Sequence, residues 1–240
     1  MSKFLILLSV LASGVAVPAY ADDASWTGPY VGGSLTVASG SAMWSDIVVP
    51  SDTGQNLSGE FTRQNITGVG GGVQVGYQKQ MQHLVVGLEG RLGYGDVNGS
   101  NQCRGQYGDY SAACETRIKG TAGLVARLGL VPAGKVLLYV TGGLAVADLE
   151  NTPAAETGPF SSTPGYQDNS KWRTGYVVGG GLEYPLDSHI SLGLEYNYQD
   201  FGSYNVQFTG IAPVNDYNPD FSVTAKTHYS TAMVRVNCRF

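Results

Sequence analysis

The sequence predicts an all-β protein, an eight-stranded antiparallel up-and-down transmembrane β-barrel, and three observations support this prediction. First, 34 of the 240 residues are glycine and only 14% are charged, whereas about 25% are charged in an ordinary soluble domain. Second, apolar and polar residues alternate with a period of two in eight separate segments, as they do in half-buried strands. Third, the connections between the segments are short and long in turn, which is typical of outer-membrane barrels.

The composition excludes several other classes of protein. A net charge of -5 leaves no electrostatic case for a general nucleic-acid binder. The glycines show no three-residue period and only 10 residues are proline, which excludes collagen. With 42% hydrophobic residues, of which many are aromatic, the chain is too apolar to be disordered.

The first residues are expected to form a secretory signal peptide. It has a positive start, an apolar stretch and two small residues before the cleavage site: Lys3, residues 4–17, and Ala19 with Ala21. The alternative is a membrane anchor helix, for which this apolar stretch is too short. We therefore expect a signal peptide at residues 1–21 and an outer-membrane β-barrel domain at residues 22–240.

The first predicted strand and the first predicted hairpin share one pattern. In residues 31–37, Val, Leu and Val alternate with Gly, Ser and Thr. Residues 68–80 place large apolar side chains on one face and mostly glycine and glutamine on the other, and residues 84–94 repeat the alternation after a short turn. We expect the apolar faces to contact lipid and the glycine-rich faces to line a narrow interior.

The second predicted hairpin consists of residues 117–128 and 138–146. In its first strand, Ile118 is expected on the apolar face, whereas Arg117 and Lys119 are expected on the polar face. The remaining strands, identified by the same alternation, are expected at residues 176–184, 190–199 and 231–240. Together these segments make eight strands, and an even number leaves both chain ends on the same side of the membrane.

Three predicted connections are tight and four are long. The tight ones are at residues 79–83, 131–135 and 185–189, and the long ones are at residues 40–66, 95–114, 149–170 and 201–224. We expect short periplasmic turns and long external loops. A soluble sandwich or lipocalin-like barrel is the alternative, but its outward polar face would be rich in Lys and Glu. Here that face is mostly Gly, Ser, Thr and Gln.

Six charged residues lie on the predicted inner faces, at similar heights above the end with the tight turns: Glu89, Arg91, Arg127, Glu183, Glu195 and Arg235. A charge in a narrow, dry lumen is costly unless it is paired and hydrogen-bonded. We therefore expect one interior ion-pair network that plugs the barrel in its periplasmic half. The alternative is a selectivity ring that lines a small conduit, although eight strands enclose only enough space for side chains to fill.

The chain has three cysteines. Cys103 and Cys114 fall in one predicted external loop, and in an exported, oxidising setting we expect a disulfide between them. They carry no metal signature, because no nearby His or Cys completes a set of four ligands. Cys238 falls on the apolar face of the last strand and is expected to be a free, lipid-facing thiol.

An enzyme would need a nucleophile, a base and an orienting group. His228 and Ser230, two positions apart on one strand face, resemble the catalytic pair of outer-membrane lipid A deacylases, but the later glutamate of that family has no counterpart here. The interpretation we favour is a polar pair at the rim of the barrel. No phosphate-binding loop or metal motif occurs, so we expect no catalytic residue, metal or cofactor.

Several stretches of the chain are similar to one family. They are residues 26–33, 86–94, 136–144, 178–184 and 194–202, and the terminal Phe240. Together they resemble the small outer-membrane β-barrel surface proteins of alphaproteobacteria, relatives of the opacity and OmpA-type barrels. The resemblance implies eight strands, surface loops and assembly through the last strand, with Phe240 as the assembly signal. Members usually have a large apolar residue where this chain has Cys238, and we expect no peptidoglycan-binding domain after the barrel.

The sequence therefore predicts a non-enzymatic barrel in the outer membrane of a Gram-negative cell. Its expected role is envelope integrity and surface interaction through the external loops. A small porin-like channel is the first alternative, and a lipid-modifying enzyme or a haem-binding surface protein, with His228 near the external surface, is a more distant one. The expected partners are outer-membrane lipid and lipopolysaccharide, the barrel assembly machinery at the last strand, and a host or surface ligand at the loops, but no nucleic acid.

Overall fold

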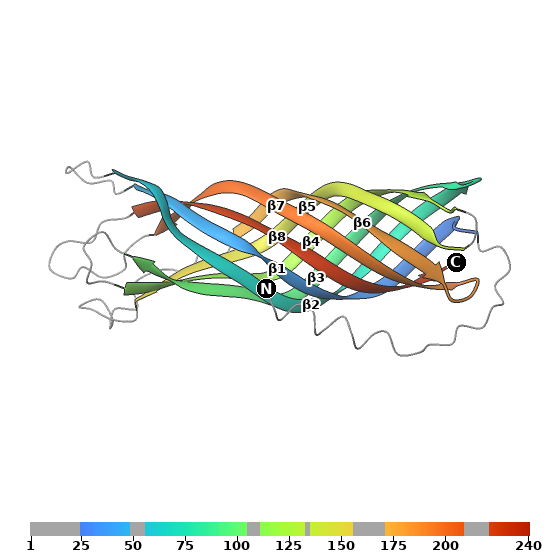
Figure 1. Ribbon diagram of the computed structural model, residues 1–240, viewed down its shortest axis with the longest axis horizontal. Helices are drawn as coiled ribbons and strands as arrows, with labels where there is room; N and C mark the ends of the chain where they lie inside the picture. The colour runs from blue at the N-terminus through green and yellow to red at the C-terminus, as the bar shows by residue number, and fades with distance from the viewer. Residues whose placement is uncertain (1–24, 49–55, 105–110, 133–134, 156–170, 209–220) are drawn as a thin grey trace.

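In the computed structural model, eight strands form one closed barrel in which β1 pairs with β8 and every neighbouring pair is antiparallel (Figure 1). The strands are β1 (Gly28–Val48), β2 (Asn56–Met81), β3 (Leu84–Arg104), β4 (Ser111–Leu130), β5 (Leu137–Ala155), β6 (Lys171–Pro185), β7 (Ile190–Phe208) and β8 (Phe221–Arg239). The structure describes residues 25–48, 56–104, 111–132, 135–155, 171–208 and 221–240. The predicted fold class is confirmed, and the signal peptide expected at residues 1–21 lies outside the described residues.

Three tight turns lie at the end of the barrel where β8 ends. Gln82 and His83 join β2 to β3, and Gln82 adopts a positive φ of 56°. Between β6 and β7, the backbone N–H groups of His189 and Ile190 donate to the Asp187 carboxylate, each at 2.7 Å. These hydrogen bonds favour the ionised form and hold the pKa of Asp187 below its ordinary value. All three turns fall where the sequence placed them.

The strands are much longer than predicted at the opposite end. Strands extend into all four of the long connections expected at residues 40–66, 95–114, 149–170 and 201–224, and only 49–55, 105–110, 156–170 and 209–220 lie between strands. The predicted bounds were wrong because the strands were identified by their outward apolar residues. A strand has such residues only over the part that contacts lipid. A span of about 9–11 residues crosses a bilayer, whereas β2 has 26 residues.

The half of the barrel near the turns has its apolar side chains outside. Leu35 is 73% exposed and Tyr94 is 78% exposed, and the predicted apolar faces of β2, β3, β5 and β7 are exposed in the same way. A soluble domain would bury such side chains, whereas a lipid bilayer covers them. No helix in the described ranges is long and apolar enough to cross a membrane.

The other half has the reverse arrangement. A cluster of apolar side chains fills the interior there, including Trp44, Ile66, Ile118, Leu149, Phe201 and Tyr229. The outward neighbours on the same strands are polar, for example Ser41, Asn65 and Lys226. This half therefore resembles a water-soluble barrel with its own core. At about 3.3 Å per residue and a tilt near 45°, it extends roughly 20 Å beyond the lipid.

Two β-bulges reverse the directions predicted for some side chains on β4. The pairing of β3 with β4 shifts between Tyr94 and Val97, and that of β4 with β5 shifts between Ile118 and Thr121. One extra residue in a strand reverses the alternation of its side chains. Ile118, predicted to face lipid, is therefore buried inside and 2% exposed. Arg117, predicted to face inward, is instead 41% exposed and lies 3.1 Å from Glu115.

Candidate functional site

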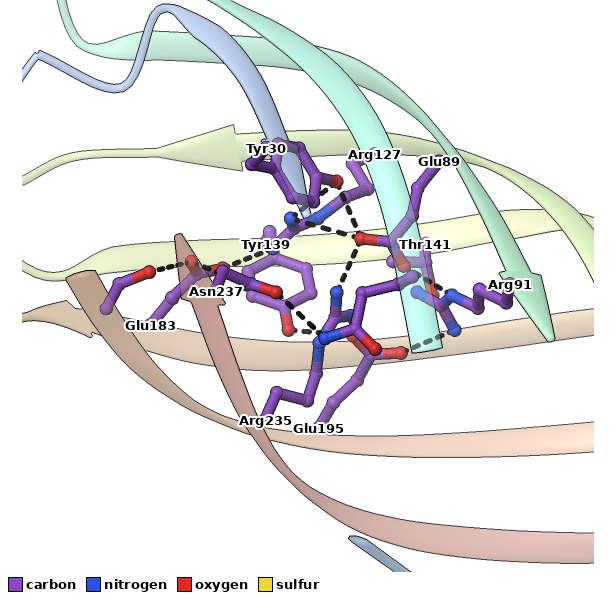
Figure 2. A network of polar contacts seen from close by, with 12 residues as sticks. Tyr30, Glu89, Arg91, Arg127, Tyr139, Thr141, Glu183, Glu195, Arg235 and Asn237 are labelled. Atoms are coloured by element: carbon purple, nitrogen blue, oxygen red, sulfur yellow. Dashed lines mark hydrogen bonds and ion pairs between the residues drawn. The ribbon is translucent and has the colours of Figure 1, made fainter. Parts of the chain in front are cut away.

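All six charged residues predicted for the lumen lie in one network in the half of the barrel near the turns (Figure 2). They come from five strands: Glu89 and Arg91 from β3, Arg127 from β4, Glu183 from β6, Glu195 from β7 and Arg235 from β8. Three carboxylates face three guanidinium groups, so the network is formally neutral. Its position in the lumen is the one expected from the sequence.

Glycines opposite the charged residues leave room for them. Gly193 is the register partner of both Glu183 and Arg235, and Gly76 is the partner of Glu89. A β-carbon at Gly76 would lie 2.5 Å from the Tyr30 hydroxyl oxygen. The glycines on the inner faces therefore allow long side chains from other strands to cross the narrow lumen.

Each guanidinium group joins two carboxylates. Arg91 lies 2.5 Å from Glu89 and 2.7 Å from Glu195. Arg127 lies 2.8 Å from Glu183 and 3.5 Å from Glu89. Arg235 lies 2.5 Å from Glu89 and also forms an ion pair with Glu195. No member can be removed without leaving an opposite charge buried and uncompensated.

Neutral side chains complete the network, and sequence reasoning did not assign them to it. The hydroxyl groups of Tyr30 and Tyr139 donate to Glu89 at 2.6 Å and to Glu195 at 2.7 Å. The Arg127 guanidinium carbon lies 4.0 Å from the centre of the Tyr139 ring, within the range of a cation–π interaction. The alternation of apolar and polar residues could have identified Tyr139, because it lies on the predicted inner face. It could not have identified Tyr30, which precedes the predicted first strand.

Two more contacts satisfy the oxygens of Glu183. The Ser191 hydroxyl donates to it at 2.5 Å and the Asn237 amide donates to it at 2.8 Å. Gln74 in turn donates to the Asn237 side-chain oxygen at 2.8 Å. Buried carboxylates with this many donors are held in fixed positions.

An apolar floor closes the lumen below the network. Trp26, which precedes β1, is fully buried, and it packs with Val85, Val131, Leu137 and Tyr139. Its backbone N–H donates to the Gln80 side-chain oxygen at 2.8 Å. The Arg239 guanidinium carbon lies 4.4 Å from the centre of its ring. Trp26 therefore covers the end of the barrel at which the turns lie.

A small cavity and the apolar cluster lie above the network. The cavity has a volume of about 120 Å³ and is lined by polar side chains such as Arg91 and Thr231 and by apolar ones such as Val125 and Tyr229. Among the described residues, the lumen therefore contains an apolar floor, a charged network and an apolar upper core in succession, with this cavity between the last two.

The structure does not pair His228 with Ser230. Instead, the Nε2 atom of His228 lies 3.1 Å from the Oγ atom of Ser41 on the neighbouring strand β1. Directly opposite residues on neighbouring strands are about 5 Å apart, whereas residues two apart on one strand are about 6.6 Å apart, so Ser41 is the nearer hydroxyl. Among the described residues, no group of three or more His, Cys, Asp and Glu side chains could hold a metal ion.

The cysteines and the chain end are placed as follows. The backbone register sets Cys103 opposite Ala112 and Cys114 opposite Asn101, on the paired strands β3 and β4. Their side chains lie outside the described residues, so the disulfide stays a prediction. Cys238 is a half-buried free thiol on β8. The Phe240 side chain is exposed, and its role as an assembly signal also stays a prediction.

The comparisons with known proteins agree with this architecture. The family model of the outer membrane protein beta-barrel domain matches residues 7–240. The chain is 28% identical over 238 residues to the 31 kDa outer-membrane immunogenic protein of Brucella melitensis, covering 98% of this chain and 91% of that one. It is 30% identical over 180 residues to the 22 kDa outer membrane protein of Rhizobium leguminosarum bv. viciae, covering 75% and 66%.

Two solved structures share the fold at low sequence identity. The outer membrane protein OprG of Pseudomonas aeruginosa superimposes with a TM-score of 0.65 at 13% identity, covering 91% of this chain and 99% of that one. The outer membrane protease OmpT of Escherichia coli gives a TM-score of 0.51 at 9% identity, covering 89% and 97%. At these identities, the likeness concerns the fold alone.

Proposed function

This chain belongs to the outer membrane protein beta-barrel domain family and lies in the outer membrane, and from that premise we propose that it is a sealed, non-enzymatic barrel that supports the envelope and presents its external loops for surface contacts. The observation that carries the proposal is the closed lumen. The ion pairs of three Arg and three Glu residues, the floor at Trp26 and the upper apolar core occupy successive levels of the lumen among the described residues.

The long strands support the part of the proposal that concerns surface contacts. The outward side chains are polar in the half that extends roughly 20 Å beyond the lipid, and the interior of that half is an apolar core. Such an extension carries the described ends of the strands clear of the lipid headgroups. The name of the Brucella relative describes that protein as immunogenic, which is compatible with a surface position.

The alternatives differ in what they require of the lumen and the rim. A porin-like channel needs a polar path through the plug, which the ion pairs of Arg127 and Arg235 occupy. An enzyme needs a base with a nucleophile and an orienting group, and His228 has a hydroxyl partner in Ser41 but no hydrogen bond to a described carboxylate. The proposal therefore assigns the role to the external surface rather than to the lumen.

Envelope support and loop contact can be separated with one variant. The shortened variant has residues 156–170 and 209–220 replaced by short Gly/Ser connections. In a strain that lacks the gene for this chain, the shortened variant should restore resistance to detergent as fully as the natural chain does. The natural chain should be cut at these loops when intact cells are treated with a protease, and the shortened chain should not. A folded, heat-modifiable shortened chain that fails to restore resistance would contradict the proposal, as would loops that resist protease on intact cells.

A further inference from the structure

One guanidinium group of the network borders a cavity. Arg91 lies at one edge of the network (Figure 2), and 17% of its side chain is exposed, whereas only 2% is exposed for Arg127 and for Arg235. Arg91 also lines the cavity of about 120 Å³ that lies above the network. Because its side chain lies in the lumen, the exposed part of Arg91 faces this cavity.

Two residues that line the cavity have buried polar atoms without a hydrogen-bond partner among the described residues. The atoms are Nη2 of Arg91 and the hydroxyl oxygen of Thr231, a residue that is only 5% exposed. Buried polar groups in native proteins nearly always have a partner. Further hydroxyl groups line the same cavity and can each donate a hydrogen bond, namely those of Ser34, Thr36 and Thr121. The cavity therefore offers several hydrogen-bond donors.

The carboxylates beside the cavity are already used by the network. Arg91 contacts one oxygen of Glu89 and one oxygen of Glu195. Arg235 contacts the other oxygen of each. All four oxygens are therefore occupied, and each of these two acids is neutralised by two guanidinium groups. The donors of the cavity need an acceptor other than these carboxylates, and a bound ion can supply it.

A fourth guanidinium group adds positive charge to the interior. Arg173 on β6 points into the upper half of the barrel, where its guanidinium carbon lies 4.4 Å from the centre of the Tyr204 ring in the apolar cluster. Its buried Nε atom has no hydrogen-bond partner among the described residues. Because the network of three Arg and three Glu residues is neutral by itself, Arg173 leaves this part of the interior positive. Such a charge favours an anion over a water molecule in the cavity.

We propose that the cavity binds a small inorganic anion of about the size of chloride, with Arg91 as its charged ligand and Thr231 as a hydroxyl donor. An anion accepts hydrogen bonds and donates none, and bonds from a charged guanidinium are roughly twice as strong as neutral ones. The cavity is large enough, since a water molecule needs only about 15 Å³ of such space. The apolar side chains of Val125 and Tyr229 border the same cavity and separate the anion from the external solvent.

The proposal predicts that the stability of the barrel depends on the anion in the buffer. The barrel, residues 22–240, is refolded in lipid vesicles with sodium chloride or, at equal ionic strength, with sodium gluconate, whose anion is much larger. It is then unfolded with urea, which supplies no halide. The folding equilibrium constant should be roughly tenfold larger in chloride once the chloride concentration is about ten times its dissociation constant.

Three variants assign this effect to the cavity. Thr231→Val keeps the shape of the side chain but removes its hydroxyl, and it should reduce the tenfold ratio to about threefold, because the loss of one hydrogen bond weakens binding about fivefold. Arg91→Gln should abolish the ratio, which is taken within one variant so that a general loss of stability cancels. Thr141→Val is the matched control, since Thr141 is buried outside the cavity lining and donates to Asn197 at 3.3 Å. It should keep the ratio of the natural chain.

The anion can also be located directly. In crystals of the barrel refolded and grown in sodium bromide, anomalous scattering should place a bromide ion in the cavity, in contact with Arg91 and Thr231. Each variant is used only after its heat-shifted gel band shows a folded barrel. A cavity that holds only water in these crystals would overturn the proposal. An equal chloride effect in Thr231→Val and the natural chain, or equal stability of the natural chain in chloride and gluconate, would overturn it as well.

Discussion

Replacing Arg235 with Ala is expected to destabilise the barrel by about 3–5 kcal/mol, which is the usual cost of removing one partner from a buried ion pair. The Arg235 side chain is 2% exposed and contacts Glu89 and Glu195. Without it, the three carboxylates of the network share only two guanidinium groups, those of Arg91 and Arg127. The free energy of unfolding, measured by guanidinium titration of the refolded chain in lipid vesicles, checks this expectation.

Two further variants separate charge from packing. Adding Glu89→Gln to Arg235→Ala makes the network neutral again and should recover part of the lost stability. Arg117→Ala removes a partly exposed cation that is also paired with carboxylates, and it should cost less than about 1 kcal/mol. If Arg235→Ala and Arg117→Ala reduced the free energy of unfolding equally, the plug would not hold the barrel together.

The second large effect is expected from one of two adjacent glycines on β5. A β-carbon at Gly143 would lie 2.1 Å from the Leu124 carbonyl oxygen and 2.7 Å from the Val125 α-carbon, so the backbone of β4 would have to move. Gly143→Ala should destabilise the barrel by about 1–3 kcal/mol or more, as overpacked cores are. A lower yield of heat-modifiable protein in the outer membrane should accompany the loss.

Gly142 provides the matched control. It faces outward, and a β-carbon there would meet no other atom within 4 Å. Gly142→Ala should therefore be neutral or stabilise the barrel by about 0.4–1 kcal/mol, because it reduces the entropy of the unfolded chain. Equal losses in the two variants would mean that glycine serves strand flexibility on β5 rather than the close approach of β4.

The half of the barrel in lipid could be predicted from the sequence because its outer and inner faces differ clearly in the residues they use. An outward apolar residue such as Leu35 alternates with inward Gly, Ser or Thr, and this pattern set the number of strands and the three tight turns. The network followed from the same alternation. Glu89, Arg127 and Arg235 are charges at inner-face positions, and only pairing makes them tolerable there.

The external half could not be predicted by the same rule, because the rule reverses once a strand leaves the lipid. Trp44 and Ile66 face the interior there, and their neighbours face water, so a search for lipid-facing residues ends too early. Bulges add a second cause. The bulge after Ile118 turns the Ile118 side chain inward. No local feature of the sequence predicts this bulge. Trp26 was missed because it covers the lumen from outside any strand.

The central claim is that the lumen is closed, and the conductance of the refolded barrel, residues 22–240, in a planar bilayer tests it most directly. A heat-shifted gel band first confirms that the barrel is folded. The plug, the floor at Trp26 and the upper core predict a silent membrane under an applied voltage. Reproducible current steps that change when Glu89 or Arg127 is neutralised would contradict the claim and establish the lumen as a conduit.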